Sequence, residues 1–312
     1  MPESHPALDG LPLVLGGNAF GWTIDRDASF AVLDAFYEAG GRAIDTAEGY
    51  SNWVPGNKGG ESESIIGQWL ESRGVRADMR IATKTGQGGA AGSYAPGAVK
   101  AACEGSCERL RSDWIDLYYV HRDDGVTSPG DVAQAFGPLA AQGTVRELGV
   151  SNTQAPRLEA FNAELRAGGY WPFTVIQPGY NLVWRSEYPL ELEALALREG
   201  MAVLPYYGLA AGFLSGKYAS PDDFGPGDRQ QNAAMFAADA AWQALNVMRA
   251  VASETGATMS QIALTWLRSR PGVWGPIASA TTPDQVRDLR ASAALVLDAD
   301  QLARLTAVSI DA

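Results

Sequence analysis

The amino-acid sequence predicts an α/β fold, a (β/α)8 TIM barrel with extra helices between strands seven and eight and at the C-terminus. Short apolar runs alternate with longer amphipathic segments, eight such runs occur, and no low-complexity linker divides the 312 residues. A repeated strand–helix unit implies a parallel sheet with right-handed crossovers, and eight units favour a closed barrel over an open sheet. We therefore expect residues 1–312 to form a single domain.

The expected strands are short runs of aliphatic, β-branched and aromatic residues. In chain order they span residues 13–16, 42–45, 80–84, 115–120, 145–150, 173–177, 201–206 and 273–277. Most of them lead into an expected helix, at 29–39, 61–72, 98–111, 131–141, 153–167, 187–198 and 283–291. The extra helices are expected at 237–254 and 260–268, before the last strand, and at 299–308.

The charge and the cysteine content exclude several classes of protein. Thirty-six acidic residues against 24 basic ones give a net charge of −12, which disfavours nucleic acid and anionic membrane surfaces as partners. No apolar run is long enough to span a bilayer, and the first residues do not resemble a secretory signal. Cys103 and Cys107 lack further metal-ligand partners, so we expect free thiols, no metal site and a cytoplasmic location.

Polar residues stand where the expected strands end, although buried strand ends are normally apolar. In parallel barrels the functional groups gather at the carboxyl ends of the strands, so these residues are candidates for an active site. The set comprises Asp45, Lys84, His121, Ser151, Asn152, Gln177 and Tyr206.

The chemistry of this set permits two interpretations. His121 is the only histidine besides His5, which excludes a zinc site built mainly of histidines, and no Gly-x-Ser-x-Gly sequence supports a serine hydrolase. Lys84 could form a Schiff base with a carbonyl compound. Alternatively, Asp45 could hold Lys84 as a cation beside the phenol of Tyr50, which would then serve as a proton donor to a carbonyl oxygen.

Several segments resemble the signatures of the aldo-keto reductases, in the order that this family has them. They are Asp45-Thr46-Ala47-Glu48-Gly49-Tyr50, Ile81-Ala82-Thr83-Lys84, Tyr119-Val120-His121, Ser151-Asn152 and Gln177-Pro178-Gly179-Tyr180-Asn181-Leu182. Gly212-Phe213-Leu214-Ser215-Gly216-Lys217-Tyr218 resembles the cofactor loop of the bacterial aryl-alcohol-dehydrogenase-like branch. The resemblance implies an NAD(P)H-dependent oxidoreductase that reduces aldehydes or ketones to alcohols and could act in reverse.

The same resemblance assigns roles to individual residues. Tyr50 would donate the proton, Lys84 and Asp45 would tune it, and His121 would orient the carbonyl. Ser151, Asn152 and Gln177 would hold the nicotinamide carboxamide and Tyr206 would stack on its ring. Further expected cofactor contacts are Gly17, Asn18, Asp45, Tyr207, Gly208, Leu209, Ala211, Gly216, Lys217, Arg229, Ser279, Thr281 and Gln285.

The family resemblance implies NADP(H) as the cofactor. NAD(H) stays possible, because Ser279 and Gln285 stand where some members of the family have basic residues for a 2′-phosphate. Arg229 could supply that charge instead. Gly86-Gln87-Gly88-Gly89-Ala90-Ala91 matches a dinucleotide fingerprint, but it follows the third strand and no helix follows at once, so we interpret it as a loop beside the active site.

Aromatic residues on the first two loops predict the substrate pocket. Phe20, Trp22 and Trp53 could form walls for a flat carbonyl or alcohol substrate, and Trp184 is a weaker candidate. Two other functions stay open: a cofactor-binding regulatory subunit of the same fold, and a lyase that uses Lys84 as a Schiff base.

Overall fold

The computed structural model describes residues 11–89 and 92–309, without the side chains of residues 228 and 229. Eight parallel strands form one curved sheet in the order β7-β6-β5-β4-β3-β2-β1-β8. Their bounds are β1 Val14–Gly16, β2 Ala43–Asp45, β3 Arg80–Thr85, β4 Ile115–Val120, β5 Val145–Ser151, β6 Val175–Gln177, β7 Ala202–Val203 and β8 Ile277–Ala278.

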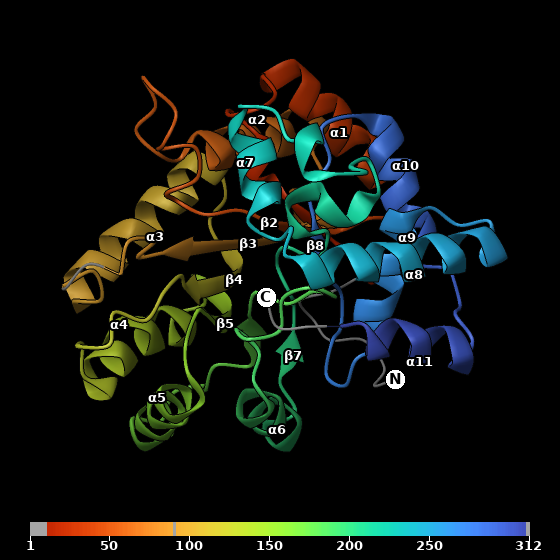
Figure 1. The fold of residues 1–312 in the computed structure, drawn as a ribbon. Helices are drawn as coiled ribbons and strands as arrows, with labels where there is room; N and C mark the ends of the chain where they lie inside the picture. The colour runs from red at the N-terminus through yellow and green to blue at the C-terminus, as the bar shows by residue number, and fades with distance from the viewer. Residues whose placement is uncertain (1–10, 90–91, 310–312) are drawn as a thin grey trace.

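Helices lie around the outside of the strands (Figure 1). One helix follows each of the first six strands: α1 Arg26–Glu38, α2 Glu61–Arg73, α3 Pro96–Leu110, α4 Pro129–Ala141, α5 Ala155–Ala167 and α6 Leu190–Glu199. Between β7 and β8 the chain forms α7 Asp228–Ala234, α8 Asp239–Thr255 and α9 Met259–Arg268. The last strand is followed by α10 Pro283–Ala291 and α11 Ala299–Ala307.

The helix starts follow from local capping chemistry. The Asp25 side chain accepts a hydrogen bond from the Ala28 amide, so α1 begins three residues earlier than the apolar spacing predicted. Ser128 caps α4 in the same way, and a proline follows it at the first helical position. The predicted order of strands and helices agrees with the structure except for α7, which was not predicted, and the boundaries differ by a few residues.

The two last strands are shorter than predicted. The expected strand 201–206 is reduced to Ala202–Val203, and Ile277–Ala278 replaces the expected 273–277. Residues in and next to these short strands still form backbone hydrogen bonds with one another. The Trp274 amide donates to the Val203 carbonyl at 3.0 Å, and the Ile277 amide donates to the Pro205 carbonyl at 2.8 Å. These bonds join β8 and the segment before it to β7 and the segment after it.

Apolar side chains on both faces of the sheet are buried. A large cluster packs between the strands and the surrounding helices, and a smaller cluster, including Val14, Leu117, Tyr119 and Val175, lies on the inner face. On the outside, Glu63 of α2 is fully buried, where it accepts hydrogen bonds from Thr83 of β3 and Arg109 of α3, each at 2.6 Å. This contact fixes two helices against the sheet below the carboxyl ends of the strands.

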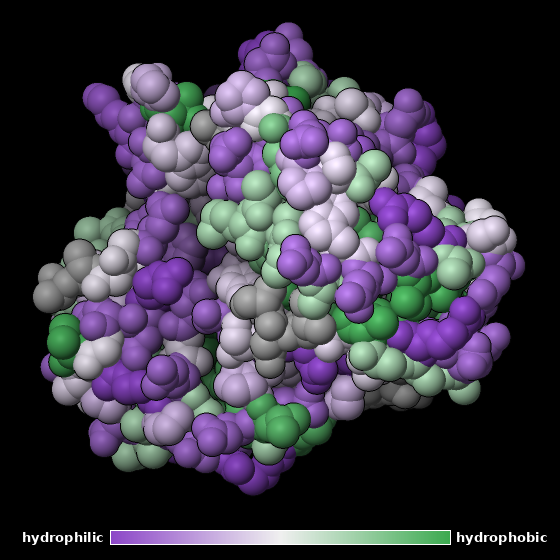
Figure 2. All heavy atoms as spheres, in the orientation of Figure 1, coloured by the Kyte–Doolittle hydropathy of each residue, from purple (hydrophilic) through white to green (hydrophobic). Residues whose placement is uncertain are grey.

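The surface is mixed in character. Figure 2 shows hydrophilic and hydrophobic residues interspersed over the face seen in Figure 1, with a hollow near its centre. In the described part of the chain, no helix is long and apolar enough to cross a membrane.

We predict that Gly67→Ala destabilises the fold because α2 and α3 meet too closely there for a side chain. A Cβ atom at Gly67 would lie 2.2 Å from the backbone oxygen of Arg109. Overpacking of this kind costs about 1–3 kcal/mol, which urea denaturation would measure as a lower free energy of unfolding. Gly97→Ala in α3 is the control, because none of the described neighbours has an atom within 4 Å of its Cβ position. Equal losses in both variants would contradict the packing argument.

Candidate active site

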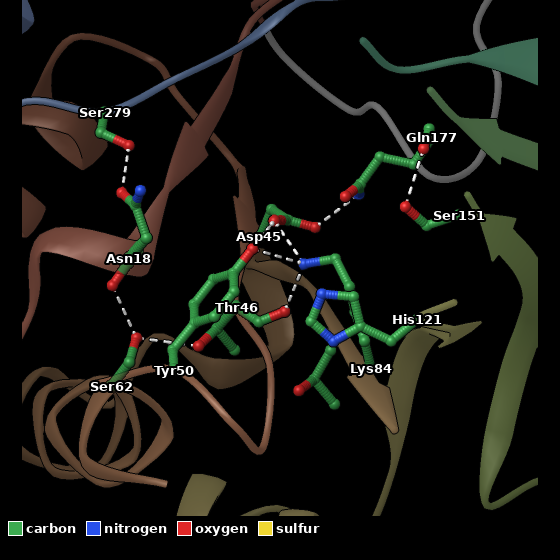
Figure 3. A network of polar contacts seen from close by, with 12 residues as sticks. Asn18, Asp45, Thr46, Tyr50, Ser62, Lys84, His121, Ser151, Gln177 and Ser279 are labelled. Atoms are coloured by element: carbon green, nitrogen blue, oxygen red, sulfur yellow. Dashed lines mark hydrogen bonds and ion pairs between the residues drawn. The ribbon is translucent and has the colours of Figure 1, made fainter. Parts of the chain in front are cut away.

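A buried ion pair lies where β2 and β3 end. The Lys84 side chain is fully buried and Asp45 is only 2% exposed. Lys84 Nζ donates to Asp45 Oδ2 at 2.6 Å and to the Thr46 carbonyl at 2.7 Å. The other carboxylate oxygen, Oδ1, accepts a hydrogen bond from Gln177 Nε2 of β6 at 2.8 Å (Figure 3). The carboxylate therefore links three strands inside the sheet.

Tyr50 reaches this ion pair from the loop after β2. Its hydroxyl oxygen accepts a hydrogen bond from Lys84 Nζ at 3.0 Å and lies 3.4 Å from Asp45 Oδ2. Burial, assisted by the Asp45 carboxylate, raises the pKa of the Tyr50 phenol well above its usual value. The Lys84 cation was expected to act in the opposite direction, by stabilising the phenolate. The phenol is therefore protonated at neutral pH, and Lys84 is placed to stabilise the phenolate that forms when the proton leaves.

Lys84 has three acceptors around one nitrogen: Asp45, Thr46 and Tyr50. They match the three N–H groups of an ammonium ion. Burial lowers the pKa of Lys84, and the Asp45 carboxylate acts in the opposite direction. We infer from the three acceptors that the charged form is the one held here.

His121 stands at the end of β4 and faces Tyr50, with 6.0 Å between the ring centroids. Its Nδ1 is shielded from solvent and has no hydrogen-bond partner among the described residues. Burial lowers the pKa of His121 well below its usual value, and the positive charges of Lys84 and Arg122 act in the same direction. The imidazole is therefore neutral at neutral pH, with one donor and one acceptor nitrogen.

The polar residues at the ends of β5, β6 and β7 form a second network. The Ser151 hydroxyl donates to the Gln177 carbonyl at 2.8 Å (Figure 3). Asn152 Nδ2 donates to the His121 carbonyl and the Tyr206 hydroxyl donates to Asn152 Oδ1, both at 2.8 Å. Asn152 has a positive φ of 47°, which asparagine tolerates better than most residues. The network fixes these side chains beside the ion pair.

Both networks open into one cavity of about 1260 Å³. It extends from Tyr50 and His121, at the ends of β2 and β4, to Ser279 and Gln285, beside β8. Pockets for a single small ligand usually measure about 300–1,000 Å³, so this cavity offers room for a cofactor together with a substrate.

Most of the predicted cofactor residues line this cavity. They are Asn18, Asp45, Ser151, Asn152, Gln177, Tyr206, Tyr207, Gly208, Leu209, Ala211, Lys217, Ser279, Thr281 and Gln285. Gly17 and Gly216 lie outside the lining: the Gly17 carbonyl accepts a hydrogen bond from Ser62, and Gly216 packs against Met259. The backbone of Arg229 lies in α7, but its side chain is outside the described part of the structure.

The predicted substrate residues divide into two groups. Trp22 and Trp53 line the cavity, and their rings meet edge to face with centroids 5.4 Å apart. Phe20 does not line it, because its ring is fully buried in the core. Trp184 also lies outside the lining and packs against Tyr206 and Phe236.

Some lining residues were not predicted as site residues. Gln87 belongs to the glycine-rich loop that was placed beside the site, and Arg122 directly follows His121, so position along the chain was a usable signal for both. Asp288 and the α7 residues Gln230, Gln231 and Asn232 carry no such signal.

Ala90 and Ala91 of the glycine-rich loop are outside the described residues. The glycine-rich sequence after β3 is not a dinucleotide-binding fingerprint of a Rossmann domain, because the strand order places β1 between β2 and β8.

The two cysteines are free thiols in α3, with Cys103 buried and Cys107 half-buried. Among the described residues, no group of three or more histidine, cysteine, aspartate and glutamate side chains could hold a metal ion.

Comparison with known proteins gives relatives over most of the chain. An aldo-keto reductase of Strobilurus tenacellus is 34% identical over 81% of this chain and 73% of its own length. An NADP(+) aryl-alcohol dehydrogenase of Phanerodontia chrysosporium is 34% identical over 64% of this chain. A norsolorinic acid reductase of Aspergillus flavus is 33% identical over 68% of it. The chain spans 56% of the length of each of the last two proteins.

These relatives are fungal, whereas the loop at 212–218 suggested a bacterial branch; the likeness to aryl-alcohol dehydrogenases is confirmed. A model of the aldo/keto reductase family matches residues 12–310, a range that contains every described element of the sheet and the whole site. The chain therefore belongs to the aldo/keto reductase family, as its sequence predicted.

Proposed function

We propose that this protein is an NADP(H)-dependent oxidoreductase that reduces aldehydes or ketones to alcohols, and that it can act in reverse. The observation that carries the proposal is the meeting of Tyr50, Lys84, Asp45 and His121 at one end of the cavity. A protonated phenol, a neighbouring cation and a neutral imidazole are what proton donation to a carbonyl oxygen requires. The reductases and the dehydrogenase among the relatives support the same class of reaction.

Each of the four residues has a distinct task in the proposed reaction. Tyr50 donates its proton to the carbonyl oxygen, and Lys84 stabilises the phenolate that this leaves. Asp45 keeps Lys84 charged and in place. Neutral His121 donates a hydrogen bond to the same carbonyl oxygen, which orients the substrate.

The cavity fits a nicotinamide cofactor, which supplies the hydride when bound. Ser151, Asn152 and Gln177 would hold the carboxamide, and Tyr206 would pack against the ring; all four line the cavity near the ion pair. At the far end the lining residues Ser279, Thr281 and Gln285 are neutral, and Lys217 contributes a positive charge to the lining. NADP(H) is favoured by the dehydrogenase relative, whose name specifies NADP(+), and NAD(H) stays a second candidate.

We further propose that the sheet closes as the expected (β/α)8 barrel, with α8 and α9 before its last strand and α11 after it. The bonds from Trp274 to Val203 and from Ile277 to Pro205 support this closure.

We also propose that residues 1–312 are one domain. A cytoplasmic location is proposed from the two free thiols.

The two other functions find less support. A Schiff-base lyase needs an uncharged lysine with a free lone pair, but Lys84 is fully buried and directs its three donors at three acceptors. A regulatory subunit without turnover does not require the complete constellation of Tyr50, Lys84, Asp45 and His121. Borohydride trapping with a carbonyl substrate would reveal a lyase.

We predict that Tyr50→Phe removes most turnover and leaves cofactor affinity nearly unchanged. The phenol donates a proton in the transition state, a contribution of about 10²–10⁴-fold, but it is not needed to hold the nucleotide. NADPH oxidation with benzaldehyde and fluorescence titration with NADPH measure the two effects. Tyr188→Phe is the control, because its buried hydroxyl has no hydrogen-bond partner in the described part of the chain and it does not line the cavity. Turnover of Tyr50→Phe within a fewfold of the wild type would remove Tyr50 from the donor role.

We predict that His121 makes the fold less stable as the pH falls from 7 towards 5. The folded protein lowers the pKa of His121, so below about pH 6.5 the unfolded chain binds a proton that the folded chain does not. The free energy of unfolding should then fall by up to about 1.4 kcal/mol per pH unit through this group alone. Urea denaturation of His121→Gln should show a correspondingly weaker pH dependence than the wild type. The same pH dependence in both proteins would mean that His121 titrates normally.

A further inference from the structure

One positive charge at the catalytic end of the cavity, the exposed side chain of Arg122, has no hydrogen-bond or ion-pair partner among the described residues. Arg122 directly follows His121 and lines the cavity, and no described residue makes a hydrogen bond or ion pair with its guanidinium group. Most arginines elsewhere in the described chain are paired, as Arg109 is with Glu63 and Arg157 with Asp123. In a protein with a net charge of −12, an unpaired arginine at the site needs a reason.

The backbone of Arg122 is held firmly although its side-chain tip is free. The fully buried Tyr94 donates its hydroxyl proton to the Arg122 carbonyl at 2.5 Å and accepts a hydrogen bond from the Arg122 amide at 3.3 Å. The next residues have structural partners: Asp123 binds Arg157 at 2.7 Å, and Asp124 accepts from the Thr127 amide at 2.8 Å. The segment therefore presents one side chain, that of Arg122, to the cavity without using it in the fold.

The other charges of the cavity do not neutralise Arg122. Its lining contains four charged side chains that the structure describes: Asp45, Arg122, Lys217 and Asp288. Asp45 is paired with Lys84, and Asp288 accepts hydrogen bonds from Thr258 and Gln261 beside α9 and α10. Glu187, whose negative charge helps burial to raise the pKa of Tyr206, does not line the cavity.

Arg122 lies on the substrate side of the site. Burial lowers the pKa of His121 and raises that of Tyr206, and the positive charge of Arg122 adds to the first effect and opposes the second. The guanidinium is therefore near both residues at the reacting end of the cavity, which all three line. A Cβ atom at Gly89 would lie 3.4 Å from Arg122 Cδ, so the arginine packs along the loop that carries Gln87. Gln87 lines the same cavity together with the ring pair of Trp22 and Trp53.

We propose that the carbonyl substrate is an aromatic compound that carries a carboxylate, and that Arg122 binds this carboxylate while the ring lies against Trp22 and Trp53. The planar guanidinium can form two parallel hydrogen bonds to a carboxylate, and the indole rings offer apolar faces to an aromatic ring. This inference rests on the proposed function, because it names the substrate class of the same site.

The kinetic test compares two aldehydes of similar shape, 4-carboxybenzaldehyde and methyl 4-formylbenzoate, at saturating NADPH. A charge-assisted hydrogen bond at a partly exposed site contributes about tenfold. Arg122→Gln should therefore lower the ratio of kcat/KM for the carboxylate to kcat/KM for the ester about tenfold, chiefly through KM. Arg122→Lys should keep part of the preference. Arg26→Gln removes an exposed charge of α1, outside the cavity lining, and should leave the ratio unchanged.

A binding measurement separates this inference from the proposed function. Tryptophan fluorescence of the NADP(+)-saturated enzyme, titrated with benzoate and with benzamide, should show tighter binding of benzoate in the wild type. That preference should be lost in Arg122→Gln. If no carbonyl compound is reduced but benzoate still depends on Arg122, the proposed function fails and the anion site stands.

Two outcomes would overturn the inference. One is an unchanged carboxylate-to-ester ratio and unchanged benzoate affinity in Arg122→Gln. The other is loss of benzoate binding in Lys217→Gln but not in Arg122→Gln, which would place the anion at the cofactor instead of the substrate.

Discussion

The Lys84–Asp45 ion pair is the interaction on which the rest of the site depends. Taking two charges out of water costs several kcal/mol per ion, and only close pairing with further hydrogen bonds offsets this cost. Here Gln177, the Thr46 carbonyl and the Tyr50 hydroxyl supply those bonds. Residues from three strands and a loop are thus held together by one desolvated pair. The loss of either ion would leave the other without compensation, at a cost of about 3–5 kcal/mol.

The burial of the pair also sets the protonation states of the neighbouring Tyr50 and His121 side chains. The same burial that requires Asp45 to accompany Lys84 keeps the Tyr50 phenol protonated and the His121 imidazole neutral. A donor in its acid form and an uncharged hydrogen-bonding group thereby stand side by side at neutral pH. Positive charge remains in the cavity at Arg122 and Lys217, within a protein that is acidic as a whole.

Much of this arrangement could be predicted from sequence because strand ends are marked by polar residues. Asp45, Lys84, His121 and Gln177 were found that way. Tyr50 was found from its place just beyond Asp45, and the family resemblance supported its role as proton donor. The bounds of the short strands β7 and β8 could not be predicted, since the residues next to them form only isolated backbone hydrogen bonds from loop segments. Phe20 was misplaced because a loop aromatic can turn towards the core as readily as towards the cavity. The place of Arg122 directly after His121 was a usable signal, but its lack of a partner among the described residues is visible only in three dimensions.

The most direct test of this account is the turnover of Lys84→Met with a neutral aromatic aldehyde at saturating NADPH, with the NADPH dissociation constant measured alongside. Methionine fills the buried volume without the charge, so the phenolate of Tyr50 loses the cation beside it. We predict a loss of turnover of about 10²-fold or more, as expected for impaired proton donation, with cofactor affinity changed only a fewfold. A folded Lys84→Met protein that turns over at the wild-type rate would contradict it.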